Sequence, residues 1–479
     1  MAGGDRLTAL DASFLHLEKG GAHMHVASIF RFDGTPPAHD ELIEAIESKL
    51  HLVPRYRQRL ADVPLGQGRP VWVDDPYFNA GYHIRHTALP EPGGDAELKR
   101  LAGRLFAQPL DRSKPLWEMW LVEGLADGHW ALVCKTHHAL VDGVSGVDIT
   151  AVLLDASPDP APPAPPDRPW TAKPVPDPAQ LLAEALVERV TQPAEIVRGL
   201  RALTRAPRQA LTALAGLAAQ AAAGFDQAPP TPFNVDIGPH RRYTWVDAEL
   251  PQFKAIKDAF GGTVNDVVLT VVTLALGRYL RRHGHDTRGL VLKAMVPVSI
   301  RADVEQGALG NRVANMYAPL PVGMEDPAEA FAFVHGEMEH LKGSGQAVGA
   351  EVLTRLVDFA PPTILSQAAR LQARQRLFNL VVTNVPGPQI PLYVLGRRMV
   401  AMYPVVPLAQ RQALGIAIMS YDGSLGFGLL SDYDAVDDLE ALADDLQRAI
   451  ADLAAKAGAG RRKLRSTNGS RPRTPAGRS

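Results

Sequence analysis

Two adjacent histidines lie in the stretch "KTHHALVDG", which runs from Lys135 to Gly143. An imidazole has an ordinary pKa of about 6.5, so it can take a proton from a substrate hydroxyl near neutral pH and return it. Asp142 and Gly143 follow closely in the chain. Glycine allows a tight turn there, and the aspartate can fix the local geometry through backbone hydrogen bonds or a salt bridge. The pattern favours one histidine acting as a general base.

A metal site is disfavoured by the positions of the two histidines. His137 and His138 end a strand-like run, and adjacent strand residues point to opposite faces of a sheet. Both imidazoles therefore cannot ligate one ion while the strand stays regular. The chain also lacks the ligand spacings CxxC and HExxH. We expect no metal at this site.

Covalent catalysis by a cysteine or a serine is disfavoured by spacing. Cys134 shares strand parity with His138, but four residues of strand span about 13 Å, which is far beyond hydrogen-bond reach. The stretch "GVSGV" at 143–147 misplaces its serine for a G-x-S-x-G nucleophile. A structural interpretation remains: Asp142 caps a helix that begins near Val144, and both histidines are packing residues. On the residues alone, this interpretation and the general base are equally open.

The composition indicates a globular chain with a basic tail. The chain has 479 residues, with 46% hydrophobic and 21% charged, which is too long for one core and fits two domains. The formal net charge is -2, yet the tail from Lys456 onward carries eight lysines and arginines and no acidic residue. The rest holds 42 basic against 52 acidic residues, a balance of -10. We expect the tail to be disordered.

No feature of the sequence predicts export or a membrane span. Cys134 is the single cysteine, so an intramolecular disulfide is impossible and nothing indicates an oxidising compartment. The N-terminal segment has early acidic residues and no long apolar run, so we predict no signal peptide. The longest strongly apolar stretch, 267–277, is well short of the roughly 20 residues of a spanning helix. Any membrane contact should therefore be peripheral.

Hydrophobic periodicity predicts mixed α and β structure on both sides of a proline-rich break. Ten prolines between Pro158 and Pro178 predict an extended surface linker, and alanine-rich helical sequence follows at 180–223. We predict an α/β fold in two domains joined by a long crossover. The predicted division is 1–155, 156–240, 241–455 and the tail 456–479, with strands at 25–34, 115–125, 129–136, 290–300, 378–387 and 413–434 and helices at 40–53, 144–155 and 261–280.

Several motifs resemble one enzyme family. "HHALVDG" resembles the HHxxxDG signature of CoA-dependent acyltransferases, which include chloramphenicol acetyltransferase and the condensation domains of peptide synthetases. Further landmarks resemble the bacterial wax ester synthase/acyl-CoA:diacylglycerol acyltransferase family, and they span nearly the whole chain in the family's order. They are "LTALDASFLHLE" at 7–18, "PLWEMW" at 115–120, "NDVVL" at 265–269, "VPVSIR" at 296–301, "GN" at 310–311 and "TNVPGP" at 383–388.

The resemblance implies a fold and a reaction. It implies two domains of the chloramphenicol-acetyltransferase type, each a mixed sheet with flanking helices, with the active site in a channel between them. It implies transfer of a fatty acyl group from acyl-CoA to diacylglycerol or a long-chain alcohol, which makes triacylglycerol or wax ester. Acyl-CoA would be a co-substrate, and no cofactor is expected. The second histidine of the motif, His138 here, would be the base, without an acyl-enzyme intermediate.

The resemblance also suggests roles around that base. His137 would orient or pack, and Asp142 would hold the loop, with Arg57 as its predicted partner. Gly143 would belong to the substrate-binding turn.

Two further motifs carry open alternatives. Pro115, Leu116 and Trp117 match the family's PLW motif, which is thought to shape the channel, although a buried aromatic strand would also explain them. Asn265 precedes an apolar helix, so it is either a helix N-cap or an amide donor to the oxyanion formed at the thioester.

The expected setting is the cytoplasmic face of a membrane or a lipid inclusion. The basic tail would contact anionic lipid or stay solvated, and without aromatic residues for base stacking it predicts no nucleic-acid partner. The helical segment 181–203 would lie on lipid or pack between the domains. Two other functions remain: condensation of acyl groups onto a polyketide or peptide acceptor, and a non-catalytic lipid-inclusion protein.

Overall fold

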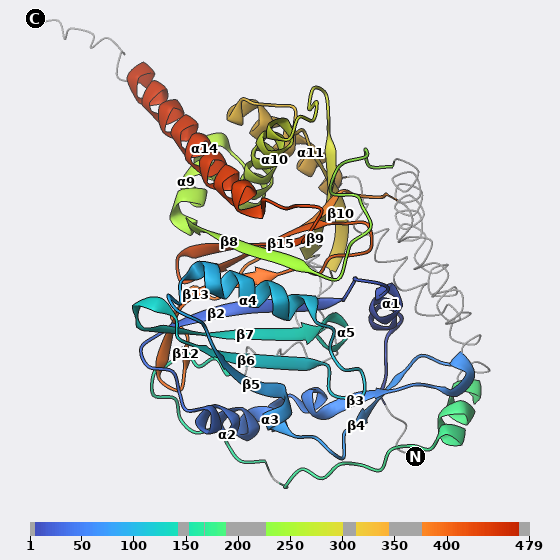
Figure 1. Cartoon of the computed structure of the whole chain (residues 1–479). Coiled ribbons are helices and arrows are strands. Elements are labelled where there is room, and N and C mark those ends of the chain that lie inside the picture. Colours follow the sequence, from blue (N-terminus) through green and yellow to red (C-terminus); the bar gives the residue numbers. More distant parts are fainter. Residues whose placement is uncertain are drawn as a thin grey trace, which may run out of the picture.

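The computed structural model describes residues 5–141, 153–166, 168–187, 227–299, 313–343 and 376–468, and these residues build two six-stranded sheets. The two sheets stack one above the other, with a helical layer over the second sheet (Figure 1). The predicted mixed α/β class in two sheet-based halves is confirmed.

The first sheet has the strand order β12-β13-β2-β7-β6-β5 and is antiparallel except for the pair β5 and β6. The strands predicted at 25–34, 115–125 and 129–136 are confirmed as β2, β6 and β7. Within this sheet His25 lies opposite His137, so the start of β2 adjoins the end of β7. The strands are β2 (His25–Asp33), β5 (Ile84–Ala88), β6 (Trp117–Glu123), β7 (His129–His137), β12 (Tyr393–Val394) and β13 (Arg397–Val405).

Strands β12 and β13 depart from the predicted domain division. They belong to the segment 241–455, yet β13 pairs with β2 and extends the first sheet. Met399 packs into the core of the first half, and Tyr403 packs into the cluster between the two sheets. Because residues 402–405 of β13 are buried on both faces, its hydrophobic pattern does not indicate which sheet it joins.

The second sheet has the order β10-β9-β11-β14-β15-β8 and mixes parallel and antiparallel pairs. The stretch predicted as strand at 413–434 forms two strands in a hairpin, whose turn uses Asp422 (φ 41°) and Gly423 (φ 84°) in the left-handed conformation that a tight hairpin requires. The strands are β8 (Arg241–Glu249), β9 (Leu292–Ser299), β10 (Val313–Leu320), β11 (Leu380–Val385), β14 (Leu414–Tyr421) and β15 (Ser424–Asp432).

Four helices cover one face of the second sheet and form the largest core cluster with it. They are α9 (Leu250–Phe260), α10 (Val264–Arg282), α11 (Pro327–Gly343) and α14 (Leu439–Asn468). The last of these corrects one expectation, because 456–468 is helical where the sequence predicted a disordered tail. Ala457 is the last buried hydrophobic residue among those whose side chains the structure describes.

The opposite face of the second sheet meets the first half of the chain through α4 (Asp95–Ala107). Leu101 and Phe106 of α4 share a cluster with Trp245 of β8 and Val133 of β7. The approach is close, since a Cβ on Gly103 would come within 2.8 Å of the Arg241 carbonyl oxygen. In Figure 1, α4 lies between β7 and β8.

The remaining elements belong to the first half. The proline-rich residues 156–166 and 168–177 contain no helix or strand, as predicted, and the helix that follows is Pro178–Val187. Most of the helix predicted at 144–155, and the rest of 180–223, lie outside the described residues. The other elements are α1 (Ala9–Leu17), α2 (His39–Lys49), α3 (Ala80–His83), α5 (His138–Val141) and a small sheet of β1 (Asp5–Arg6), β3 (Gln58–Ala61) and β4 (Val71–Asp74).

Candidate active site

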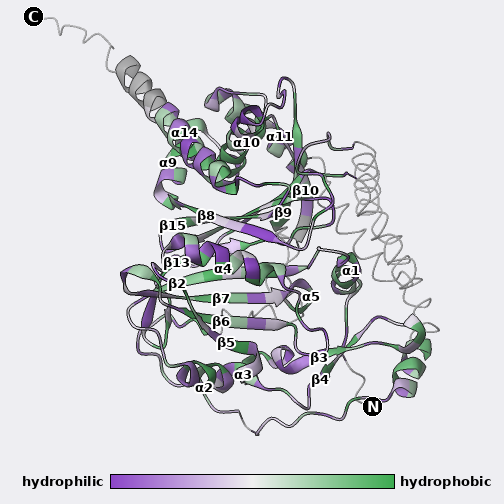
Figure 2. Cartoon of the chain, in the orientation of Figure 1, coloured by the Kyte–Doolittle hydropathy of each residue, from purple (hydrophilic) through white to green (hydrophobic). Residues whose placement is uncertain are grey.

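The two histidines lie where strand β7 gives way to the short helix α5. His137 is the last strand residue, and its N–H donates to the Leu116 carbonyl at 2.9 Å. His138 is the first helical residue, and its N–H donates to the Met24 carbonyl at 2.8 Å. Figure 2 shows β6 and β7 changing from hydrophobic to hydrophilic towards this end of the sheet. The change from strand to helix falls between the two side chains and gives them different surroundings.

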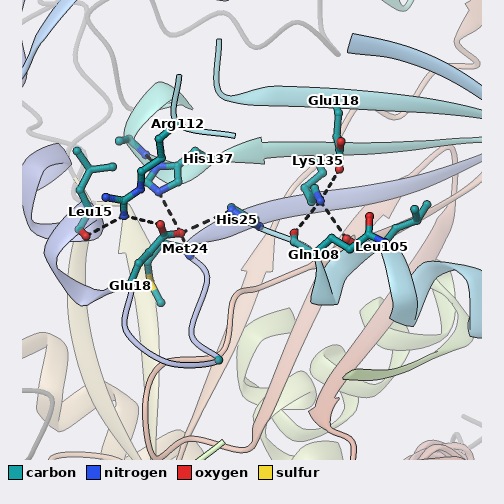
Figure 3. Close-up of polar contacts among 12 residues, drawn as sticks. Leu15, Glu18, Met24, His25, Leu105, Gln108, Arg112, Glu118, Lys135 and His137 are labelled. Atoms are coloured by element: carbon teal, nitrogen blue, oxygen red, sulfur yellow. Dashed lines mark hydrogen bonds and ion pairs between the residues drawn. The ribbon is translucent and has the colours of Figure 1, made fainter. Parts of the chain in front are cut away.

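His137 is buried, with 1% of its surface exposed, and both ring nitrogens face polar atoms. Its Nδ1 accepts the Ala139 N–H at 3.1 Å, and its Nε2 lies 3.3 Å from Glu18 Oε1 (Figure 3). An Nδ1 that accepts a hydrogen bond carries no proton, so a neutral ring has its proton on Nε2, the nitrogen on the side of the carboxylate. The His137 ring therefore contacts the backbone of α5 on one side and Glu18 on the other, which is a structural role.

His138 is half-buried, and its ring stacks on Phe14 of α1 with centroids 4.1 Å apart and an interplanar angle of 27°. The Phe14 ring packs against one face of the imidazole. Of the two histidines, His138 is the more exposed.

Glu18, directly after α1, is the group that sequence reasoning missed. Its carboxylate accepts the Met24 N–H at 2.7 Å and an N–H of Arg112, and it also faces His25 and His137 (Figure 3). Burial acts to raise the pKa of Glu18, but hydrogen bonds from His137 and Arg112 lower it further than burial raises it, to below its usual range. The only signal in the sequence was its place at the end of the quoted stretch 7–18.

Lys135, two residues before His137, is a buried cation that joins three elements. Its ammonium pairs with Glu118 of β6 and donates to the carbonyls of Leu105 and Gln108 at 2.9 Å each (Figure 3). Burial lowers the pKa of Lys135, and the charge of Glu118 opposes that effect. The lysine thereby fixes the C-terminal end of α4 against the strand that carries the histidines.

The PLW residues lie beside the histidines and are all buried. Trp117 is opposite Thr136 in the sheet, donates from Nε1 to the Tyr56 carbonyl at 2.8 Å and stacks on His83. Pro115 and Trp117 also line a pocket of about 100 Å³. The structure thus brings the PLW and HH motifs together on neighbouring strands, and Leu116 bonds His137 directly.

Asn265 is placed elsewhere, and its predicted role as an N-cap is wrong. The N-cap of α10 is Thr263, whose hydroxyl accepts the Asp266 N–H, and the Asp266 carboxylate bonds back to the Thr263 N–H. Asn265 is half-buried in the first turn, on the helix layer opposite the face that meets α4. Asp266 binds His335 of α11 at 2.9 Å.

Two predicted residues cannot be placed. Asp142 and Gly143 lie outside the described residues. Arg57, the predicted partner of Asp142, lies with its guanidinium 4.6 Å from the centre of the Trp170 ring.

The second half of the molecule reaches this region through Arg241 at the start of β8. Arg241 donates to the Gly21 carbonyl, in the loop after Glu18, and to the Gly238 carbonyl. It also lines a small cavity with His23 and His25. The loop that supports the histidines is therefore held by both halves.

A cluster of ligating side chains lies in the second half of the molecule. Within the described ranges, one set of three ligating side chains converges, namely His283, Asp437 and Asp438 at the surface of the second half.

Sequence comparisons assign the chain to a family. The family model for the wax ester synthase/diacylglycerol acyltransferase catalytic domain matches residues 7–268, and the model for the WS/DGAT C-terminal domain matches 309–454. The chain belongs to the wax ester synthase/diacylglycerol acyltransferase family. The resemblance drawn from the motifs is confirmed, and the enzyme is an O-acyltransferase that acts on diacylglycerol or an alcohol.

Relatives of this acyltransferase are similar over almost the whole chain. A putative diacylglycerol O-acyltransferase, MT1809 of Mycobacterium tuberculosis (strain CDC 1551 / Oshkosh), is 34% identical, covering 94% of this chain and 90% of the relative. The probable diacylglycerol O-acyltransferase tgs1 of M. tuberculosis (strain ATCC 25618 / H37Rv) is 33% identical, covering 94% and 96%.

Solved structures agree with the fold. The wax ester synthase/diacylglycerol acyltransferase from Marinobacter aquaeolei VT8 is 28% identical with a TM-score of 0.65, covering 95% of this acyltransferase and 100% of that chain. A starter condensation domain of rhizomide synthetase, in complex with C8-CoA, shares the fold at 16% identity with a TM-score of 0.57, covering 96% of each chain. The expected two-domain fold of the chloramphenicol-acetyltransferase type is confirmed.

Proposed function

We propose that His138 is the general base of an acyl transfer from acyl-CoA to the hydroxyl of diacylglycerol or a long-chain alcohol. The observation that carries this assignment is the difference between the two histidines. His137 is 1% exposed, whereas His138 is half-buried and its ring stacks on Phe14.

The reaction is balanced without a covalent enzyme intermediate. His138 takes the proton of the acceptor hydroxyl as the oxygen attacks the thioester carbon. The tetrahedral oxyanion collapses, the carbon–sulfur bond breaks, and the proton passes from His138 to the leaving CoA thiolate. The products are an ester and free CoA thiol, so the chemistry calls for acyl-CoA as co-substrate and for no resident cofactor.

The oxyanion requires hydrogen-bond donors, and Asn265 is our candidate. Its side chain is half-buried at the start of α10, where the helix N-terminus adds positive potential. Because α10 belongs to the helical layer of the second sheet, this role requires a substrate channel that reaches the beginning of that helix. Asp142 is proposed to hold the loop, and Pro115, Leu116, Trp117 and Gly143 are proposed to contact substrate.

We also propose peripheral contact with a membrane or lipid inclusion on the cytoplasmic side. Diacylglycerol and long-chain alcohols reside in lipid, so the enzyme must meet a lipid surface. No single helix in the described parts is long and apolar enough to cross a membrane, although the bent pair α9 and α10 meets the length and composition criteria together. Exposed apolar side chains that suit a lipid surface include Leu65 and Tyr77, which are 85% and 86% exposed, and Leu186.

The proposed reaction is tested by the release of CoA thiol from palmitoyl-CoA. Release should depend on added diacylglycerol or hexadecanol, and a labelled acyl chain should appear in triacylglycerol or wax ester in equal amount. The proposal would be contradicted if CoA thiol were released at the same rate without acceptor. It would also be contradicted if the enzyme required an acyl group attached to a carrier protein. A panel of acceptors with one acyl-CoA would then rank diacylglycerol against alcohols.

A further inference from the structure

We infer that Glu18 is a positioning residue for acyl transfer: its carboxylate fixes the tautomer and orientation of His137 and, through His137 and Met24, the backbone that presents His138. The inference rests on the proposed function, because it concerns how the proposed base is held.

The carboxylate lies at the centre of a buried polar cluster (Figure 3). Its Oε1 lies 3.3 Å from His137 Nε2, 3.6 Å from His25 Nε2 and 2.7 Å from the Met24 nitrogen. Its Oε2 accepts from Arg112. Four contacts from three separate segments of the chain converge on one side chain that is 11% exposed.

Two routes of polar contacts lead from this carboxylate to the backbone of His138. In the first, Glu18 Oε1 lies 3.3 Å from His137 Nε2, and His137 Nδ1 accepts the N–H of Ala139, the residue after His138. In the second, Glu18 accepts the Met24 N–H, and the Met24 carbonyl accepts the N–H of His138. The first turn of α5 is therefore held on both sides of His138 by routes that end at Glu18.

The same segment also sets the plane of the base. Phe14 is on α1, which ends at Leu17 directly before Glu18, and its ring stacks on His138 at 4.1 Å. A shift of α1 would move both the stacking face and the carboxylate. The segment 7–18 thus acts as one unit that positions the base.

The role requires a charged carboxylate, and the surroundings supply one. Burial acts to raise the pKa of Glu18, but the groups that face it, His137, Arg112, His25 and His23, favour the anion. The net result is a pKa below the usual range, so Glu18 is ionised at neutral pH. An anion accepts hydrogen bonds only, and His137 must then donate from Nε2.

The test is Glu18→Gln, which keeps the size of the side chain but removes the charge and adds an amide donor. The amide can point its N–H at His137 and favour the other tautomer. We expect kcat to fall about 10- to 100-fold, the range typical when a supporting hydrogen-bond partner is lost, while KM for palmitoyl-CoA stays within about twofold. The acidic limb of the kcat/KM profile should move to lower pH, because the loss of a nearby negative charge disfavours the imidazolium.

Asp155→Asn is the matched control. Asp155 is a half-buried carboxylate of the same half that binds Lys49 at 2.8 Å and pairs through its backbone with Tyr393. Its loss should leave kcat and the acidic limb at wild-type values. Wild-type kcat and an unmoved limb in Glu18→Gln would overturn the inference, as would an equal loss in Asp155→Asn.

Two further variants complete the test. If Glu18→Gln shows no cooperative melting transition, Glu18→Asp replaces it: this variant keeps the charge with a shorter reach, so kcat should fall while the acidic limb stays in place, and wild-type kcat would overturn the inference. His138→Ala separates the two claims. Full activity in His138→Ala defeats the proposed base itself, whereas an inactive His138→Ala with a fully active Glu18→Gln defeats only the positioning role.

Discussion

At the residue scale, the site depends on a strand that ends between two histidines. His137 stays in the sheet and bonds Leu116, while His138 enters α5. The adjacent histidines, and the expectation that they form neither a metal site nor part of a nucleophile relay, came from the sequence, since strand parity and spacing are local properties. The role of Glu18 could not be predicted from the sequence. Its contact with His137 joins positions far apart in the chain, and no local sequence pattern indicates such a contact.

His83 gives a prediction about pH and stability. It is buried, stacks on Trp117 with ring centroids 4.6 Å apart, and burial lowers its pKa to about 4. The unfolded histidine has a pKa of about 6.5, so the unfolded chain binds the proton first as pH falls. The stabilising contribution is therefore complete above about 6.5 and is lost between there and about 4.

His83→Phe keeps an aromatic ring at this position and should reduce the loss of melting temperature between pH 7 and pH 4. The check is a series of thermal melts across that range. His285→Gln removes an exposed histidine and serves as the control. If His83→Phe and wild type lose melting temperature in parallel, the buried ring is not the group that titrates.

At the element scale, the residue that caps α10 differs from the residue proposed to act in catalysis. The sequence located this helix from its apolar run and offered Asn265 as either its cap or an oxyanion donor. It could not settle the cap, because threonine and asparagine are both good caps and the pattern does not fix the first turn within two residues. Thr263 and Asp266 form the capping box instead. Asn265 therefore does not cap α10.

Paired variants at this helix test the assignment. Thr263→Ala should lower the free energy of unfolding by about 1 kcal/mol and leave kcat nearly unchanged. Asn265→Ala should keep the melting temperature and lower kcat by about 10² to 10³ if its amide supports the oxyanion. An Asn265→Ala enzyme with wild-type kcat would remove the oxyanion role.

At the scale of the whole molecule, the two halves are joined by more than a linker. The sequence predicted the two α/β halves correctly because periodicity marks strands and helices, and the proline-rich stretch marks the break. It could not place β13 in the first sheet, since the pairing of β13 with β2 is a long-range choice between two similar sheets. Arg241 adds a second tie by bonding the loop next to Glu18.

The basic tail gives a prediction about lipid binding. Deleting 460–479 removes seven lysines and arginines and leaves the buried residues of α14 up to Ala457 in place. Turnover with a detergent-dispersed acceptor should stay at the wild-type level. Binding to vesicles that contain anionic lipid should weaken, by up to about 1 kcal/mol for each charge near the surface, and the difference should vanish at high salt. Loss of turnover on the dispersed acceptor would show that the tail takes part in the site.

The general base is the central claim, and His138→Ala tests it most directly. The measurement is kcat for transfer from palmitoyl-CoA to a saturating acceptor at neutral pH, with the melting temperature recorded on the same sample. The account predicts a fall in kcat of about 10² to 10⁴ in a protein that melts like the wild type. A folded His138→Ala enzyme that transfers acyl groups at a near-normal rate would contradict it.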